Sequence, residues 1–155
     1  MNNNDIFRLI TSAFNLKDTS IAKTFASTDM KVTTVDIATW LSEETDNAET
    51  TLTDVQLASF LNGLINMKRG KREGEQPKPE TELNNNMILQ KLRIALNLKA
   101  EDMLNTFEFV GVEFNKHELG AFFRKPGNKH YRPCPDAVLR DFLMAVEAQR
   151  EASLG

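Results

Sequence analysis

This chain of 155 residues contains one cysteine and no long apolar run, and each of these scarcities excludes a class of protein. The single cysteine, Cys134, has no partner for an internal disulfide, which fits a reducing cytoplasm. No apolar run reaches the roughly 18 to 20 residues that a membrane helix needs. The segment Met1–Asp5 lacks the basic and apolar regions of a signal peptide. The sequence therefore predicts a cytoplasmic protein without a membrane segment.

Groups that carry out chemistry are also scarce. Only two histidines, His117 and His130, are present to activate a serine, threonine or cysteine nucleophile, and we expect both to face solvent. Neither stands at a metal-binding spacing from Cys134 or from a pair of carboxylates. The seven glycines form no phosphate-binding loop behind a strand. We therefore predict a protein that is not an enzyme, with no catalytic residue, no metal site and no cofactor.

What the chain does contain is one pattern written twice. Residues 1–73 align with residues 83–155 at a constant offset of 82 without a gap, and 14 of the 73 pairs are identical. Average amino-acid usage would give about 4 or 5 identities by chance. The identical pairs include Asn2–Asn4 with Asn84–Asn86. The excess of identities predicts a tandem duplication.

The domain organisation follows from this duplication. We expect a first helical repeat at residues 1–70 and a second at residues 84–155. Between them, residues 71–83 are polar and contain Gly74, Pro77 and Pro79, as a linker does.

Each repeat contains four segments in which apolar residues recur at helical spacing. The predicted fold class is therefore all-α, with eight helices. The asparagines at the start of each repeat are suited to capping the first helix. Thr53 with Gln56, and Asn115 with Glu118, read as capping boxes at the start of two further helices.

The second and third helices of each repeat loosely resemble a helix-turn-helix. In the first repeat the third helix is expected at Thr34–Glu44, and its acidic residues would repel DNA. The connection before this helix is longer than the three or four residues of a tight motif. The third helix of the second repeat, with Lys116, Arg124 and Lys125, is compatible with DNA by charge.

The two repeats differ in charge. Residues 1–82 carry 9 basic and 13 acidic residues, a net charge of −4, whereas residues 83–155 carry 10 and 9, a net charge of +1. The contrast is sharpest before the fourth helix, where the acidic residues 42–49 correspond to the basic residues 124–132. Opposite charge at corresponding positions predicts a surface loop that has specialised.

Two basic clusters supply the candidate binding residues. Basic residues beside an aromatic side chain suit phosphates and a stacked base. The candidates for contact with a macromolecule are Lys68, Arg69, Lys71 and Arg72 in the first cluster, and Lys116, Arg124, Lys125, Lys129, His130, Tyr131 and Arg132 in the second.

Several segments resemble the YehS-like family of uncharacterised bacterial proteins. The resemblance is carried by Ala13-Phe14-Asn15-Leu16 and its copy Ala95-Leu96-Asn97-Leu98, by Phe60–Ile65 and by Lys68–Arg72. It covers essentially the whole chain and implies two copies of a domain of unknown function. It implies no reaction, ligand or catalytic residue.

Two functions compete on this reading. The first is a non-enzymatic adaptor or regulator that binds another macromolecule, in particular a protein. The alternative is nucleic-acid binding through the helix-turn-helix-like second repeat. The sequence leaves open the oligomeric state and whether the two repeats share one core.

Overall fold

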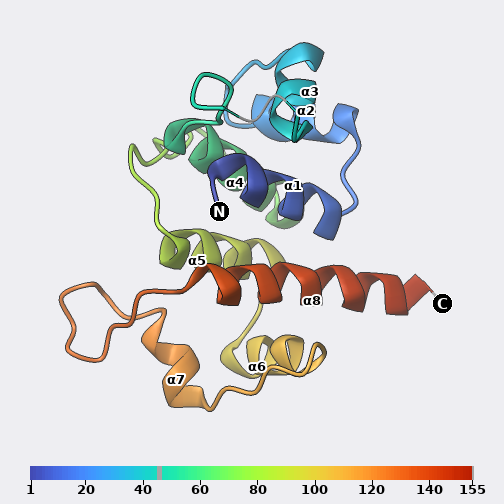
Figure 1. The fold of residues 1–155 in the computed structure, drawn as a ribbon. Helices are drawn as coiled ribbons and strands as arrows, with labels where there is room; N and C mark the ends of the chain where they lie inside the picture. The colour runs from blue at the N-terminus through green and yellow to red at the C-terminus, as the bar shows by residue number, and fades with distance from the viewer. Residues whose placement is uncertain (45–46, 155) are drawn as a thin grey trace.

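The computed structural model describes residues 1–44 and 47–154, which form eight helices and no strand (Figure 1). The helices of the first repeat are α1 (Asn3–Ala13), α2 (Asp18–Ala26), α3 (Thr34–Leu41) and α4 (Asp54–Arg69). Those of the second repeat are α5 (Asn85–Leu96), α6 (Ala100–Glu108), α7 (Lys116–Ala121) and α8 (Asp136–Leu154). The predicted all-α fold and tandem duplication are confirmed.

The helix starts follow the caps written in the sequence. Asn2 caps α1 by accepting the backbone N–H of Asp5 at 2.8 Å, and its copy Asn84 caps α5 by accepting the N–H of Met87 at 2.9 Å. Both predicted capping boxes are formed, at the start of α4 and of α7. Local sequence therefore fixes where the corresponding helices of the two repeats begin.

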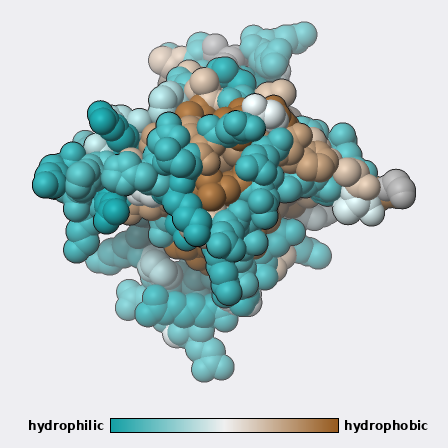
Figure 2. Space-filling model, turned by 90° about the horizontal axis from the view of Figure 1, so that it is seen from below, coloured by the Kyte–Doolittle hydropathy of each residue, from teal (hydrophilic) through white to brown (hydrophobic). Residues whose placement is uncertain are grey.

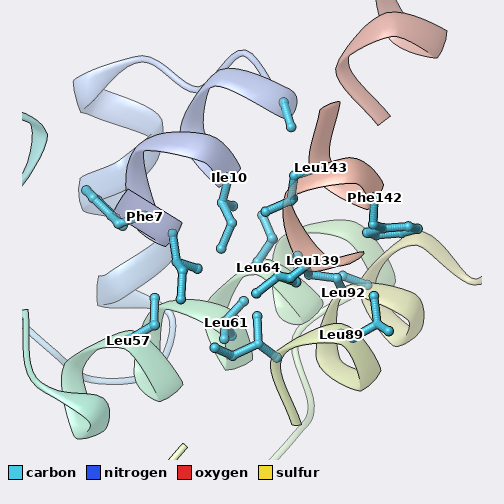
Figure 3. Close-up of a cluster of buried hydrophobic side chains, with 14 of the residues drawn as sticks. Phe7, Ile10, Leu57, Leu61, Leu64, Leu89, Leu92, Leu139, Phe142 and Leu143 are labelled. Atoms are coloured by element: carbon cyan, nitrogen blue, oxygen red, sulfur yellow. The ribbon is translucent and has the colours of Figure 1, made fainter. Parts of the chain in front are cut away.

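Four central helices join the repeats into one core. In Figure 1, α1 and α4 lie against α5 and α8, while α2 with α3 and α6 with α7 cover the two outer sides. The apolar side chains of Ile10, Leu64, Leu92 and Leu143 point toward one another across this junction (Figure 3). All four are at most 1% exposed, so the two repeats share one apolar interior.

The junction is nearly symmetric, because each of its two main contacts is a copy of the other. Helix α1 corresponds to α5 and α4 corresponds to α8, so the packing of α4 on α5 is repeated by the packing of α8 on α1. Asp54 Oδ2, at the start of α4, accepts the backbone N–H of Leu83 at 2.9 Å. Its copy Asp136 Oδ2 accepts the amino group of Met1 at 2.9 Å. Each repeat thus holds the first residue of the other.

The repeated asparagines do more than cap helices. Asn4 Oδ1 accepts the N–H of Leu52 at 2.8 Å, and its copy Asn86 Oδ1 accepts the N–H of Cys134 at 2.9 Å. Both asparagines are buried. Each therefore holds the segment that precedes the last helix of its repeat and satisfies backbone groups that would otherwise be buried without a partner.

The segment between the repeats is attached at several points. The amide of Gln76 accepts a hydrogen bond from Asn66 Nδ2 at 2.9 Å, and Glu80 forms an ion pair with Lys91 at 2.9 Å. Lys91 also donates to Asn62 Oδ1 at 2.7 Å. These contacts hold the connection along α4 and α5.

Candidate functional site

The short helix α7 is placed by a cap at its start and by burial of one side. Asn115 Oδ1 accepts the N–H of Glu118 at 2.8 Å, and Glu118 Oε1 accepts the N–H of Asn115 at 3.0 Å. Leu119 and Ala121 are buried, which leaves His117 exposed. The predicted exposure of His117 is therefore confirmed.

The loop that follows α7 is fixed at its far end. The N–H of Arg132 donates to the carbonyl of Ala121 at 3.1 Å, which closes the loop on the end of α7. Asn86 Nδ2 donates to the carbonyls of Arg132 and Phe122 at 2.8 Å and 3.1 Å. Within the loop, Asn128 Oδ1 accepts the N–H of His130 at 2.8 Å. The buried asparagine thus anchors the loop that carries most of the predicted binding residues.

A hollow of about 500 Å³, here called the α7 pocket, lies between α7 and this loop. Its walls are mainly apolar, and side chains with basic groups stand among them. The apolar residues are Phe114, Ala121, Phe122, Pro133, Pro135 and Val138, and the polar residues are His117, Glu118, Lys129, His130 and Arg132. The pocket can therefore enclose an apolar group and place an attached acidic group near positive charge.

The two histidines meet in the α7 pocket. The ring centroids of His117 and His130 lie 5.5 Å apart and the rings are nearly perpendicular. The sequence predicts His130 as a candidate binding residue and His117 only as a surface residue. No sequence pattern indicates that the two histidines lie together.

The hydroxyl and thiol nucleophiles are not found in the pocket. Among the residues that the structure describes, no serine, threonine or cysteine lines it. Cys134 lies buried nearby, and burial raises the pKa of its thiol to about 12, so it stays protonated at neutral pH. Within residues 1–44 and 47–154, no three His, Cys, Asp or Glu residues are grouped as a metal site requires.

The structure divides the second predicted cluster between two surfaces. Lys129, His130 and Arg132 line the α7 pocket. Arg124 and Tyr131 line a different hollow, beside the start of α5. Lys125 is exposed and lines neither.

Lys116 also lies outside both hollows. It forms an exposed ion pair with Glu101 at 3.3 Å, which reduces the charge that it can offer to a ligand.

The first predicted cluster is divided in the same way. Lys68 lies 5.4 Å from the ring centroid of Phe14, at the junction of the repeats. Arg69 lines a hollow beside the end of α5, and Lys71 and Arg72 are exposed beyond α4. The residues of each basic cluster therefore do not form a single surface patch, although they are close together in the sequence.

The helix-turn-helix resemblance has little geometric support. Seven residues, 109–115, separate α6 from α7, and α7 contains only six residues. In the first repeat α3 ends at Leu41, so the expected helix to Glu44 is wrong by three residues. Of the acidic segment that follows, Thr45 and Asp46 lie outside the described residues. A recognition helix normally follows a turn of three or four residues and fills a major groove, which α7 is too short to do.

The face that carries α6 and α7 has an apolar middle bordered by hydrophilic residues (Figure 2). Single exposed apolar residues are ordinary on protein surfaces, whereas a grouped apolar area with a polar border is typical of contact sites. Among the described helices, none is both long enough and apolar enough to cross a membrane.

Comparisons with known proteins agree with the duplicated architecture. A family model described as "Protein of unknown function (DUF1456)" matches residues 3–70 and again residues 85–150. The chain is 35% identical over 156 residues to the uncharacterized protein YehS of Escherichia coli (strain K12), with all of both chains covered. No solved structure matches the chain. The chain belongs to the DUF1456 family, of which it carries two copies of the domain.

Proposed function

We propose that this protein is a non-enzymatic adaptor or regulator that binds a partner protein through the α7 pocket. The observation that carries the proposal is the pocket itself, a hollow of about 500 Å³ with aromatic and proline walls and four side chains with basic groups. Such a site suits an apolar side chain that packs against Phe114 and Phe122, whose rings are in edge-to-face contact, beside carboxylates on the partner. The preferred partner is therefore an acidic segment with an apolar anchor.

The first repeat supports this proposal by contrast. At the offset of 82, the counterparts of His117, Lys129, His130 and Arg132 are Val35, Asn47, Ala48 and Thr50, none of them charged. The scaffold is shared while the basic groups occur in only one copy. Specialisation of one copy is the pattern expected when the duplicated domain provides stability and one loop provides recognition.

We also propose that the protein is located in the cytoplasm. The protein's single cysteine is buried and unpaired, as is common in proteins of a reducing compartment.

Site-specific photo-crosslinking in Escherichia coli tests this function. A photoreactive residue replaces His117 in one variant and its exposed counterpart Val35 in the other. We expect a discrete protein adduct from position 117 that disappears when Lys129→Glu and Arg132→Glu are added. We expect position 35 to give no such adduct. Equal adducts from both positions, or an adduct that survives the charge reversal, would contradict the proposal.

A further inference from the structure

A second surface, distinct from the α7 pocket, runs along α5. Two hollows of about 440 Å³ and 240 Å³ lie beside the end and the start of this helix and share Gln90 and Phe123 in their walls. We call the pair the α5 groove. Helix α5, with twelve residues at 1.5 Å each, is itself about 18 Å long.

The α5 groove brings together residues that are far apart in the sequence. Arg69, from the first basic cluster, and Arg93 line the hollow at the end of α5. Arg124 and Tyr131, from the second cluster, line the hollow at its start. The two basic clusters of the sequence therefore contribute to opposite ends of one surface.

The charge of the groove is of one sign. Of the residues that the structure describes, no aspartate or glutamate lines either hollow. Among the described residues, Arg69, Arg93 and Arg124 form no ion pair with a carboxylate. Three arginines without acidic partners along one groove favour an anionic ligand whose charges are spread over its length.

Flat surfaces stand beside these arginines. The guanidinium of Arg93 lies 4.7 Å from the ring centroid of Phe123, and its Nε donates to the carbonyl of Leu98 at 3.0 Å. This hydrogen bond holds the guanidinium over the ring. Tyr131 is half-buried in the adjoining hollow. Nucleobases stack on guanidinium planes and on aromatic rings of this kind.

We propose that the α5 groove binds single-stranded nucleic acid. The arginines contact phosphates, and unpaired bases stack on Arg93 and Tyr131. A single strand fits a groove because its bases are free to enter the hollows, whereas a duplex exposes only base edges within its own grooves. Together with the proposed protein contact at α7, this site would place a protein partner beside an unpaired strand.

Fluorescence anisotropy with labelled oligonucleotides of about 12 nucleotides tests the proposal. The arms are single-stranded RNA, single-stranded DNA and duplex DNA of matched length. We expect the wild-type protein to bind a single strand more tightly than duplex, and the RNA and DNA arms distinguish the source of the strand. Absence of single-strand binding at about 50 mM salt, or tighter binding of duplex, would overturn the proposal.

Matched variants locate the binding. Arg69→Glu with Arg124→Glu, both exposed, should weaken single-strand binding at least about tenfold. It should also reduce the salt slope by about 1.4, since each single-strand phosphate contributes about 0.7. Tyr131→Ala should weaken binding through loss of stacking, without the change in slope.

The control, Lys23→Glu with Lys31→Glu, makes the same charge change at exposed positions of the first repeat. A second control, Lys129→Glu with Arg132→Glu, makes the same charge change in the α7 pocket. Both should leave most of the single-strand affinity, and all variants should keep the wild-type melting temperature. If the control weakens binding as much as Arg69→Glu with Arg124→Glu, the groove is not the site.

Discussion

The two repeats keep the same frame and place their aromatic residues differently. In the first repeat Phe7, on α1, lies 4.9 Å from Phe60 between ring centroids. The second repeat has Leu89 at the position of Phe7 and gains Phe114 at the position of Val32, 5.0 Å from Phe107. The aromatic ring has thus moved from the first helix to the segment before α7, where it lines the α7 pocket.

This difference teaches that an aromatic ring can be absent from one core position of a repeat and present at another. Similar total volume is enough to fill a core, so a large residue lost at one position can be compensated at another. In the second repeat the compensation places an aromatic side chain at the wall of a surface hollow. The proposed binding surface is therefore connected to the packing of the core.

The largest expected difference between the copies is in the loss of stability on substitution at one glycine, Gly63. A Cβ at Gly63 would lie 2.1 Å from the carbonyl oxygen of Thr24, a backbone atom, so α2 and α4 approach too closely for any side chain. We expect Gly63→Ala to reduce the free energy of unfolding by about 3 kcal/mol, measured by urea denaturation. The counterpart of Gly63 is Ala145, which is fully buried.

The reverse change at that counterpart is the matched control. Ala145→Gly should cost only about 1 kcal/mol, from helix propensity. Equal losses for the two substitutions would show that the helices pack at the same distance in both repeats, against the present account.

A smaller and symmetric loss is expected at the buried asparagines. Asn4→Ala and Asn86→Ala each remove an acceptor from a buried backbone N–H, of Leu52 and Cys134 respectively. Each substitution should lower the free energy of unfolding by about 2 kcal/mol. The control Asn105→Ala, at an exposed position on α6, should change stability by less than about 0.5 kcal/mol. A loss of stability at only one of the two asparagines would show that this buried hydrogen bond does not stabilise both copies.

The smallest expected effect concerns the pH dependence of the ion pair between Asp136 and the amino group of Met1. Hydrogen bonds from Asn85, and then the amino group of Met1, hold the pKa of the Asp136 carboxyl below its usual range. A lowered pKa in the folded state stabilises the protein above the unfolded pKa, near 3.8, and this contribution is lost as the pH falls through the lower folded value.

Because Asp136 is exposed, Asp136→Asn should reduce stability at pH 7 by less than about 1 kcal/mol. The difference in stability between wild type and variant should then shrink as the pH falls through the acidic range. Thermal unfolding at a series of pH values measures this difference. A difference that grows toward acidic pH would have the wrong sign for this ion pair.

Much of the frame was predictable because the signals were local or repeated. The periodic apolar residues predicted eight helices, and the capping boxes at Thr53 and Asn115 are formed. Gly111, in the turn that follows the end of α6, has a left-handed φ of +78°, which glycine adopts without strain. Such features depend on a few neighbouring residues, which is why one sequence is enough to find them.

The proposed binding surfaces were not predictable to the same extent, because they depend on contacts across the fold. Arg69 and Arg124 share the α5 groove although 55 positions separate them. Lys129, His130 and Arg132 line the α7 pocket, whereas Tyr131, which lies between them in the sequence, lines the α5 groove. One signal was present and misread: three consecutive asparagines, identical in both repeats, exceed the single residue that a helix cap uses.

The central claim is that the two repeats form one interior through the contacts of α1 with α8 and of α4 with α5. Its most direct test is a protease site inserted beside the exposed Gly74, which is cleaved after the full chain has folded. We predict that the two fragments remain together in size-exclusion chromatography and unfold in a single transition. Fragments that separate under native conditions and melt independently would contradict the claim.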